Sequence, residues 1–380
     1  MPFHILVLAG GSGTRLWPLS RLSLPKHLLP IGPDGTTLLR ATVERVLGLA
    51  DSVHVVTTAD QVPACSAALE SVEGVAIIAE PIARGTGPAL GLATTWIART
   101  DPEAVICSVH ADHHVGDDDA YRAAVVAAAG WALATNGLAT VGIRPTHAAT
   151  GFGYIELGPE VEETRWAAPP GSERWPEDLH KQAAELTANE VLGFVEKPAR
   201  EVAQRYVGDN RHLWNLGLFA WPAARFHREL SRADPQLAAA VEGVVSARAG
   251  GDEDGARVRY SSLTPIAVEP LVMERTDRLT VVQAAFPWSD LGSWPDIHEA
   301  RLGSGEGDAM GNVVEGDAVT LQSRNCLVAG NGGRLIAVVG GEGLIVVDTG
   351  DAVLVVPAGQ AQSVRDLACH LGDLGRPDLQ

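Results

Sequence analysis

The sequence has few cysteines, few aromatic residues and no long apolar run. Its 380 residues include 4 cysteines, which lie far apart and form no CxxC pair, so neither a zinc ribbon nor a disulfide framework is expected. No apolar run reaches the length that crosses a bilayer. The first residues, MPFHILVLAGG, lack the basic and apolar layout of a signal peptide. We therefore expect a protein of the reducing cytoplasm with no membrane segment.

Positive charge is also scarce. The chain has 29 Lys and Arg residues against 47 Asp and Glu residues, which gives a formal net charge of −18. This balance argues against a nucleic-acid partner, because a phosphate backbone demands a basic surface. A phosphate ligand would need local cations or a bound divalent metal, helped by screening over a Debye length of about 8 Å.

Hydrophobic patterning predicts an α/β protein. Helix-like segments alternate with apolar runs that are typical of buried parallel strands, as βαβ crossovers require. The predicted strands are 5–10, 53–58, 75–80, 104–109 and 138–143, and the predicted helices lie near 37–49, 61–72, 86–99 and 118–135. After a surface excursion at 159–187, which follows a strand at 151–158, we expect strands at 191–198 and 279–286 and helices near 199–207, 222–233 and 235–248.

The pattern changes after Gly303. Short apolar runs follow, with Gly, Asp or Asn at the corners and no room for a helix between them. Such runs predict a small all-β unit, similar to a few coils of a β-helix, closed by a helix near 361–371. We therefore expect two domains, 1–303 and 304–380. The second has few candidate catalytic residues, so we interpret it as an oligomerisation or docking element.

The most informative stretch is LVLAGGSGTRLWPLSRLSLPKHLLP, residues 6–30. A Walker A loop needs GxxxxGK[ST], and the chain has no Gly-Lys pair. A dinucleotide fingerprint needs a third glycine where Leu16 stands. The remaining functional interpretation is a phosphate cradle of backbone N–H groups, with Arg15 as a bidentate donor and Lys26 beyond it. A tight turn with a solvated Arg and Lys is the structural alternative.

Two further motifs follow predicted strands. In HADHH (110–114), Asp112 lies at the carboxyl end of a strand, where ligands of such sheets bind. Zinc held by His110, His113 and His114 is the less favoured alternative, because adjacent residues rarely all face one ion. PIARGTGPAL (81–90) opens a helix, whose N–H groups could bind an anion or a base edge, although it could equally be an ordinary helix start.

Several polar residues suit a sugar phosphate. Glu196 and Lys197 in FVEKP combine a carboxylate for hydroxyl groups with an ammonium for a phosphate, although a solvated pair is the ordinary alternative. Asn215 in WNLGLFAW could bind a sugar hydroxyl, and Asp290 in DLGSW is an isolated turn acid by pattern alone.

The string LAGGSGTRLWPLS…PK is similar to the signature of sugar-1-phosphate nucleotidyltransferases. With Trp17 after Leu16, it resembles the mannose-1-phosphate guanylyltransferase branch in particular, and the resemblance runs through almost the whole chain. It departs at 84–88, where the family usually reads R-N-T-A-P and this chain reads RGTGP, and at Leu216, where Ser or Ala is usual.

The resemblance implies a Rossmann-like mixed sheet of the nucleotide-diphospho-sugar transferase type. It also implies a Mg²⁺-assisted reaction in which GTP and mannose 1-phosphate give GDP-mannose and pyrophosphate. A homodimer is expected. Two alternatives stay open: a related enzyme that uses another nucleoside triphosphate or sugar, and a non-catalytic regulatory paralogue that binds GDP-mannose.

The same resemblance assigns roles to individual residues. Arg15, Lys26 and Lys197 would be catalytic, and Asp112 and Asp290 would bind the metal. The sugar phosphate would lie against Gly153, Tyr154, Glu196, Lys197 and Asn215. The nucleotide would lie against Leu8, Ala9, Gly10, Gly11, Ser12, Gly13, Thr14, Arg15, Gly85, Thr86 and Pro88.

Overall fold

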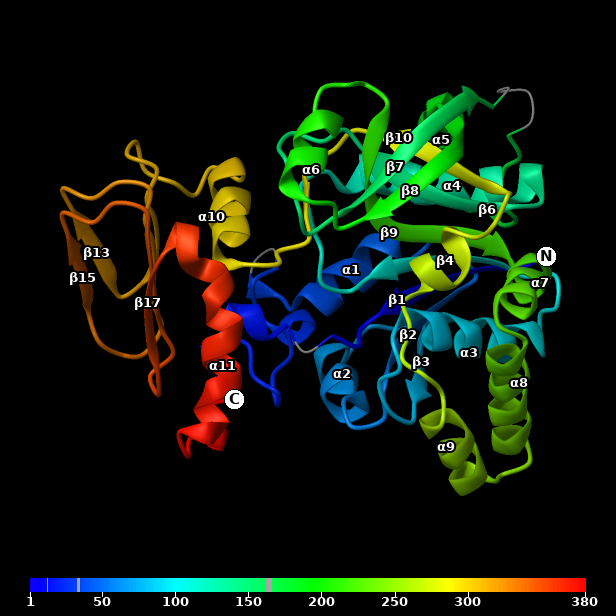
Figure 1. Cartoon of the computed structure of the whole chain (residues 1–380), viewed down its shortest axis with the longest axis horizontal. Coiled ribbons are helices and arrows are strands. Elements are labelled where there is room, and N and C mark those ends of the chain that lie inside the picture. The colour runs from blue at the N-terminus through cyan, green and yellow to red at the C-terminus, as the bar shows by residue number, and fades with distance from the viewer. Residues whose placement is uncertain (12, 33–34, 162–165) are drawn as a thin grey trace. The chain divides into compact units, whose positions relative to one another are not determined.

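The computed structural model describes residues 1–11, 13–32, 35–161 and 166–380. Its contacts divide the chain into two compact units, each assembled from separate segments (Figure 1). The first, here called the sheet unit, comprises 1–10, 42–111 and 117–286. The second, here called the arm unit, comprises 11–41, 112–116 and 287–380.

The sheet unit is built on a mixed nine-stranded sheet with the order β3-β2-β1-β4-β9-β6-β10-β8-β7. The first four strands are parallel, β9 is antiparallel to both its neighbours, and β6 and β10 are again parallel. The strands are β1 (Phe3–Leu8), β2 (Ser52–Thr58), β3 (Val75–Glu80), β4 (Val105–His110), β6 (Leu138–Ile143), β7 (Gly153–Glu160), β8 (Ala188–Glu196), β9 (His212–Pro222) and β10 (Leu279–Ala284).

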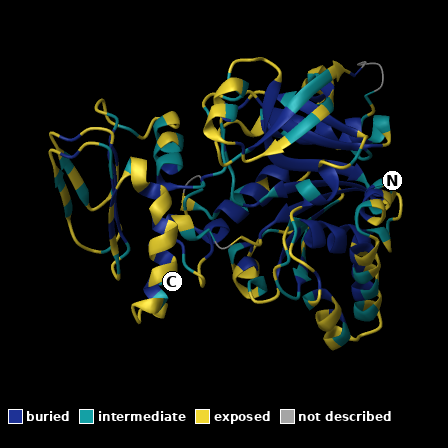
Figure 2. Cartoon of the chain, in the orientation of Figure 1, coloured by how far each residue is buried: buried dark blue, intermediate teal, exposed yellow. Residues whose placement is uncertain are grey.

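Helices bury the faces of this sheet, and the central strands are dark blue in Figure 2 because almost all of their residues are buried. All six residues of β1 are buried, as a strand covered on both faces requires. One large core joins the sheet to α3, α7, α8 and α9. The helices of the unit are α2 (Val62–Ala68), α3 (Thr86–Ala98), α4 (Asp118–Thr135), α5 (Glu177–Glu185), α6 (Arg200–Tyr206), α7 (Ala223–Ala233), α8 (Pro235–Ala249) and α9 (Glu253–Ser261), and α1 (Leu38–Val46) runs across the boundary of the two units.

Local sequence signals explain where several helices begin and end. The Asp234 side chain accepts hydrogen bonds from the N–H groups of Gln236 and Leu237, and Pro235 occupies the first turn of α8. Asp117 caps α4 in the same way, and Asn136 ends it in a left-handed conformation. The helix predicted over 118–135 is α4 itself. No helix in the described part of the chain combines the length and apolar composition that a bilayer crossing requires.

The predicted mixed α/β fold is confirmed, but several elements were not predicted, among them β9, α5 and α9 of the sheet unit. Strand β9 is buried along almost its whole length. Its pattern was missed because Asn215 and Gly217 interrupt the apolar run. Helix α5 lies within the predicted surface excursion, and α9 follows a glycine-rich turn.

The arm unit ends in two small sheets of mostly parallel strands, consistent with the predicted β-helix-like organisation. One sheet has the order β12-β14-β16-β17, and the other pairs β13 with β15. Before and after them lie α10 (Trp294–Gly303) and α11 (Val364–Asp373). The strands are β12 (Val313–Gly316), β13 (Ala318–Leu321), β14 (Leu327–Gly330), β15 (Ile336–Val339), β16 (Leu344–Asp348) and β17 (Val353–Pro357).

The C-terminal strands share one apolar core with the segment that follows the glycine loop. Leu16, Trp17 and Leu29 belong to the same buried cluster as Leu327 and Ile345. The Trp17 indole N–H donates to the Leu379 carbonyl at 2.7 Å, and the Trp17 carbonyl accepts from Trp294 at 3.0 Å. The compact units do not follow the expected domain boundary, because the arm unit also contains 11–41 and 112–116. The domains 1–303 and 304–380 therefore remain a prediction from the sequence pattern.

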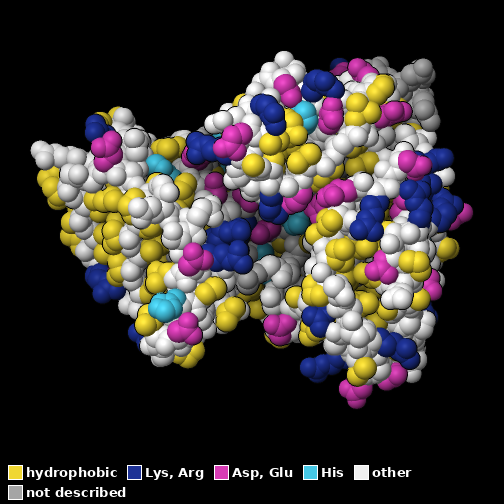
Figure 3. Space-filling model, in the orientation of Figure 1, with side chains coloured by type: hydrophobic (Ala, Val, Ile, Leu, Met, Phe, Trp, Pro, Cys, Tyr) yellow, Lys and Arg dark blue, Asp and Glu magenta, His cyan; other side chains and the backbone are white. Residues whose placement is uncertain are grey.

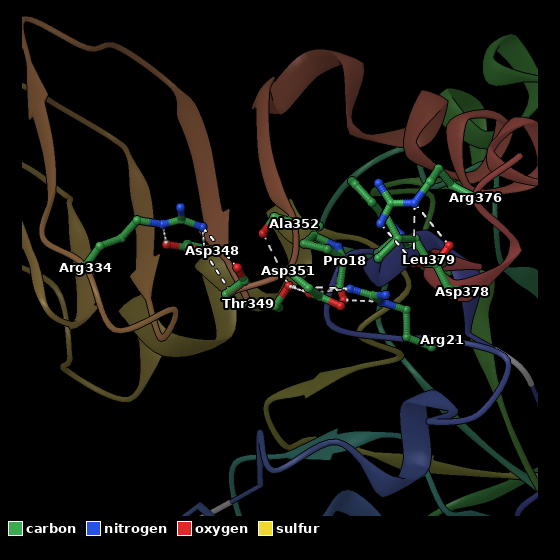
Figure 4. A network of polar contacts seen from close by, with 12 residues as sticks. Pro18, Arg21, Arg334, Asp348, Thr349, Asp351, Ala352, Arg376, Asp378 and Leu379 are labelled. Carbon is green, nitrogen blue, oxygen red and sulfur yellow. Dashed lines mark hydrogen bonds and ion pairs between the residues drawn. The ribbon is translucent and has the colours of Figure 1, made fainter. Parts of the chain in front are cut away.

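Polar contacts reinforce this association (Figure 4). The Arg21 guanidinium donates to the Pro18 carbonyl at 2.8 Å and to the Asp351 carboxylate at 2.9 Å. Further along the strands, Arg334 donates two hydrogen bonds to Asp348, at 2.6 and 2.9 Å, and these bonds hold the pKa of Asp348 at about 2. The C-terminal strands therefore support the segment that carries Arg15 and Lys26.

Candidate functional site

A short antiparallel ribbon brings Asp112 and Asp290 into one region of the arm unit. Strand β5 (His114–Val115) pairs with β11 (Trp288–Ser289), and His114 lies opposite Ser289. Asp112 comes two residues before His114, and Asp290 comes directly after Ser289. Because the strands run in opposite directions, both carboxylates lie at the same end of the ribbon. The two residues are distant in sequence and are joined only by this pairing.

Lys26 connects the two acids. Its ammonium donates to Asp112 Oδ2 at 2.8 Å and also to the backbone carbonyl of Asp290. The Lys26 side chain is buried, with 8% of its surface exposed. A buried ammonium needs such partners, because removing it from water without them is costly.

Gly13 makes room for Lys26. Its φ is 62°, in the left-handed region, and a Cβ added there would lie 2.2 Å from the Lys26 Cβ. Its carbonyl accepts a hydrogen bond from the Ser20 hydroxyl at 2.7 Å. Only glycine allows this turn and this close approach together.

Arg15 lies in the same loop, in the short helix Thr14–Leu16, and its side chain is exposed. No ion pair holds its guanidinium within the described residues, so it can bind an anion from solvent. Gly11 and Thr14 flank the loop, and Ser12 lies outside the described residues. The glycine loop and the segment after it therefore carry one exposed cation, Arg15, and one buried cation, Lys26.

Asp112 and Asp290 in the arm unit offer carboxylate oxygens, which suit a divalent cation that prefers oxygen ligands. Burial raises the pKa of Asp290, and repulsion from Asp296 and Asp112 adds to this effect against the attraction of Lys26. Asp112 and Asp290, the two predicted metal ligands, repel each other when both are ionised. A cation at this end of the ribbon would therefore stabilise both carboxylates in their ionised form. Carboxylate oxygens are ligands that Mg²⁺ prefers.

For two of the three histidines of the zinc alternative, the structure has the required proximity: His110, Asp112 and His113 each offer one ligand atom within 4.8 Å of the others, whereas His114 is not part of this group. His113 also has a structural contact. The Trp288 indole N–H donates to the His113 Nδ1 at 3.2 Å, and the two rings pack edge to face with centroids 5.2 Å apart. This nitrogen therefore acts as a hydrogen-bond acceptor and fixes the ribbon.

In the sheet unit, Leu8, Ala9 and Gly10 leave β1 at the carboxyl edge of the parallel strands. The Ala9 N–H donates to the Val56 carbonyl at 2.8 Å, and the Ala9 carbonyl accepts from the Thr57 hydroxyl at 2.6 Å. These bonds hold the start of the glycine loop against the neighbouring strand.

The loop before α3 has a conformation that only glycine adopts. Gly85 has φ 83° and ψ 171°, and a Cβ there would lie 2.5 Å from the Ile266 carbonyl oxygen. The Thr86 hydroxyl accepts from the Val268 N–H at 2.9 Å, and Pro88 lies in the first turn of the helix. This geometry explains the departure at residue 85, because a longer side chain would collide with the backbone.

A buried acid next to this loop was not predicted. Glu80 is the last residue of β3 and is 5% exposed, and it accepts a hydrogen bond from the Tyr260 hydroxyl. Burial raises the pKa of Glu80 to about 7. The signal for it was present in the sequence, since it ends the apolar run VAIIAE directly before PIARGTGP.

The residues predicted to bind the sugar phosphate lie together on β7, β8 and β9. Gly153 pairs with Glu196 across β7 and β8, and a Cβ at Gly153 would lie 2.7 Å from the Glu196 carboxylate. Lys197 has φ 46° and forms an ion pair with Glu196, in which both side chains are accessible to solvent. These three residues form one edge of the predicted sugar site.

Tyr154 and Asn215 have more buried positions. Tyr154 is fully buried, and its hydroxyl donates to the Ala149 carbonyl at 3.0 Å, so the ring supports β7 from inside the core. The Asn215 Oδ1 accepts from the Thr140 hydroxyl at 3.1 Å and from the Gly217 N–H at 3.2 Å. These bonds orient the Asn215 amide and leave its NH₂ group as the donor for a ligand.

Two further acids near Glu196 were also not predicted. Burial raises the pKa of Glu269, and the Glu196 charge raises it further; the pKa of Glu274 is raised for the same two reasons. Glu269 and Glu274 therefore both lie near the Glu196 carboxylate. Such a surface suits sugar hydroxyl groups, which donate hydrogen bonds to carboxylates.

Comparison with known proteins assigns the chain to a family. The Nucleotidyl transferase family matches residues 4–305, and the MannoseP isomerase/GMP-like beta-helix domain matches residues 316–371. The chain belongs to the Nucleotidyl transferase family. The predicted resemblance and the predicted β-helix-like unit are thereby confirmed.

Named relatives indicate which branch of the family the chain resembles. The chain is 34% identical to mannose-1-phosphate guanylyltransferase of Escherichia coli over 350 residues, which cover 88% of this chain and 66% of the relative. It is 34% identical to the xanthan biosynthesis protein XanB of Xanthomonas campestris over 98% of this chain and 74% of the relative. A crystal structure from Thermus thermophilus, described as a mannose-1-phosphate geranyltransferase, matches with a TM-score of 0.80 at 32% identity. The match covers 98% of this chain and 100% of that one.

We expect Gly13→Ala to impair turnover strongly. A left-handed conformation costs an alanine about 1–2 kcal/mol, and the new methyl group would displace Lys26. A displacement of about 1 Å in a reacting group can lower the rate about 100-fold. Steady-state turnover and thermal unfolding should be measured on the same preparations.

Gly11→Ala is the matched control for folding, because no atom of the described residues lies within 4 Å of a Cβ built at Gly11. It should leave the unfolding temperature unchanged. Wild-type turnover in Gly13→Ala would show that the contact between Gly13 and Lys26 is not needed.

Proposed function

We propose that the protein is a mannose-1-phosphate guanylyltransferase, which makes GDP-mannose and pyrophosphate from GTP and mannose 1-phosphate. The observation that carries this proposal is the group formed by Lys26, Asp112 and Asp290 in the arm unit. Family membership and the named relatives support the choice of substrates. We place the reaction in the cytoplasm, where GTP is available.

The reaction is a displacement at phosphorus. An oxygen of the sugar phosphate attacks the α-phosphorus of GTP, the bond from that phosphorus to the bridging oxygen breaks, and pyrophosphate leaves. The nucleophile is already an anion, so no general base is needed. Catalysis is therefore positioning and neutralisation of charge.

The cations divide this task. Arg15, exposed and without an ion pair among the described residues, would bind the β- and γ-phosphates of the leaving group. Lys26 would neutralise charge at the attacked phosphate. Lys197 would place the attacking phosphate, and its left-handed backbone directs it away from the strand that it follows.

Asp112 and Asp290 would hold the metal, which we propose to be Mg²⁺. When bound, the ion would supply positive charge that neutralises the nucleotide phosphates.

The sugar would lie against the carboxylate of Glu196 and the NH₂ group of Asn215. Both are fixed by neighbouring contacts, Glu196 by Lys197 and Asn215 by Thr140 and Gly217. Groups fixed in this way can distinguish sugars that differ at one hydroxyl, because a mismatched hydroxyl leaves a polar group unpaired.

We also propose a homodimer formed through the outer face of β13 and β15. Val319 and Leu321 on β13 pair in register with Ala337 and Val339 on β15, and all four point outward. Leu321 is 60% exposed and Val339 is 67% exposed. Figure 3 shows hydrophobic side chains gathered over these strands at the left of the molecule. Such a patch is typical of an interface.

Substrate choice can be tested by measuring pyrophosphate release with Mg²⁺ for each pairing of a nucleoside triphosphate with a hexose 1-phosphate. We expect the highest kcat/KM with GTP and mannose 1-phosphate, and chelation of the metal should abolish the signal. A higher value for another pair would replace these substrates but keep the mechanism. No release by folded protein that binds GDP-mannose would favour the regulatory alternative.

We expect Lys197→Ala to lower kcat by about 100-fold or more, because the attacking phosphate would lose its positioning cation. Lys181→Ala is the matched control, since Lys181 lies on α5 and is 72% exposed, and it should have wild-type kinetics. Near-normal turnover of Lys197→Ala would show that the sugar phosphate binds elsewhere.

We expect wild-type protein to be a dimer by light scattering at micromolar concentration and the double variant Leu321→Glu, Val339→Glu to be a monomer, because buried glutamates without partners oppose association. Val258→Glu, at a site 71% exposed on α9, is the control and should remain a dimer. A monomeric wild-type protein would refute the proposed interface.

A further inference from the structure

Helix α6 lies in the chain between two of the residues predicted to bind the sugar phosphate. It begins at Arg200, shortly after Lys197, and the chain that follows it enters β9, which carries Asn215. Ala203 is buried, and the other residues of α6 are exposed or half-buried (Figure 2). A segment with so little buried apolar surface has low local stability of its own. Contacts at its ends must therefore fix α6 if Lys197 is to have a defined position.

Stacked rings fix the far end of α6. Tyr206 is its last residue, and the Tyr206 ring stacks on His212, the first residue of β9, with centroids 3.7 Å apart and an interplanar angle of 19°. The Tyr206 ring also packs against Tyr154 of β7, with centroids 5.3 Å apart. Tyr154 is itself fully buried and donates to the Ala149 carbonyl. The rings therefore join α6 to both β7 and β9.

A tight turn orients the His212 ring. The Asp209 Oδ2 lies 2.6 Å from the His212 Nδ1, and Oδ1 accepts from the N–H groups of Arg211 and His212 at 2.8 and 3.1 Å. Gly208 and Asn210 have φ values of 83° and 58°, in the left-handed region. Because a carboxylate only accepts, Nδ1 carries the proton of this bond. The imidazole is therefore held by its edge and presents its face to Tyr206.

Lys197 is held at the near end of α6. Its N–H donates to the Phe152 carbonyl at 3.2 Å, and the buried Pro198 leads into the helix. The lysine thus lies between the end of β8 and a helix whose far end is fixed by stacked rings. Positioning matters here, because a displacement of about 1 Å in a reacting group can lower the rate about 100-fold.

The rings also lie next to other residues of the predicted sugar site. Gly153 directly precedes Tyr154 on β7, and Asn215 follows His212 on β9. The residues predicted to bind the nucleotide belong to other segments, after β1 and at the start of α3. Loss of the stacked rings should therefore disturb the sugar phosphate and spare the nucleotide.

We propose that Tyr206 and His212 are positioning residues for the sugar phosphate. Their stacked rings fix α6 and thereby Lys197, without contacting the substrate. This inference rests on the proposed function, since it assumes that Lys197 binds the attacking phosphate.

The first test removes the Tyr206 ring. In Tyr206→Leu, we expect KM for mannose 1-phosphate to rise about tenfold, the order expected for the loss of one aromatic pair, and KM for GTP to stay within about twofold. Tyr206→Phe keeps the ring and should have nearly wild-type values. A general loss of stability would not separate the two KM values in this way.

Two variants of His212 separate its two contacts. His212→Asn keeps a donor for Asp209 and loses the ring, so it should reproduce Tyr206→Leu. His212→Phe keeps a ring and loses the donor, so its KM for mannose 1-phosphate should lie closer to wild type. The double variant Tyr206→Leu, His212→Asn should be no worse than either single variant, because both changes remove the same contact.

Gln204→Ala is the matched control, because Gln204 is exposed on the same helix. It should have wild-type kinetics. Thermal unfolding of each variant shows whether it is folded, and His212→Asn provides the same comparison if Tyr206→Leu does not fold.

The outcomes separate this inference from the proposed function. An unchanged KM for mannose 1-phosphate in folded Tyr206→Leu, or equal rises for both substrates, would refute the role of the rings alone. Near-normal turnover of Lys197→Ala would refute the sugar-phosphate site on which both proposals rest. A wild-type preference for another hexose 1-phosphate would replace the proposed substrate, and the same variants would then be compared with that sugar.

Discussion

The ion pair between Lys26 and Asp112 is the interaction on which the candidate site depends. It joins the segment after the glycine loop to the loop after β4, and the second bond of Lys26, to the Asp290 carbonyl, adds the segment after β11. A buried ammonium that lost either partner would be an uncompensated charge, which is costly. The need to satisfy this charge therefore fixes three distant segments at one place, and Gly13 permits it by leaving room for the lysine side chain.

The C-terminal strands take part in this arrangement. They do not form an isolated appendage, because Trp17 packs in their core and donates to the Leu379 carbonyl. Arg21 adds a polar tie to Asp351. Residues that contact no substrate in the proposed reaction thus hold the segment that carries two of the proposed catalytic cations. The outer apolar face of the same strands is separate from this core and is available for association.

Electrostatics explains how an acidic protein can bind phosphates. The net charge of −18 is spread over the chain, whereas the proposed reaction assigns Arg15, Lys26 and Lys197 to the phosphates. The acids of the site have distinct proposed tasks: Asp112 and Asp290 for a metal and Glu196 for a sugar. Burial raises the pKa of Glu80 and of Asp290, because in both cases it disfavours the charged form.

The sequence by itself determined the α/β class, most strands and helices of the sheet unit, the glycine loop and the family. The strands and helices follow from hydrophobic periodicity, and the glycine loop follows from local backbone chemistry. Both are set by residues that are close together in the sequence. Only the tertiary structure decided that Asp112 and Asp290 share one end of a ribbon, that Tyr154 is buried, and that Tyr206 packs against it. It also decided that the C-terminal strands pack with Trp17. Each of these facts depends on pairing between segments far apart in the chain, and no local pattern encodes the register of such a pairing.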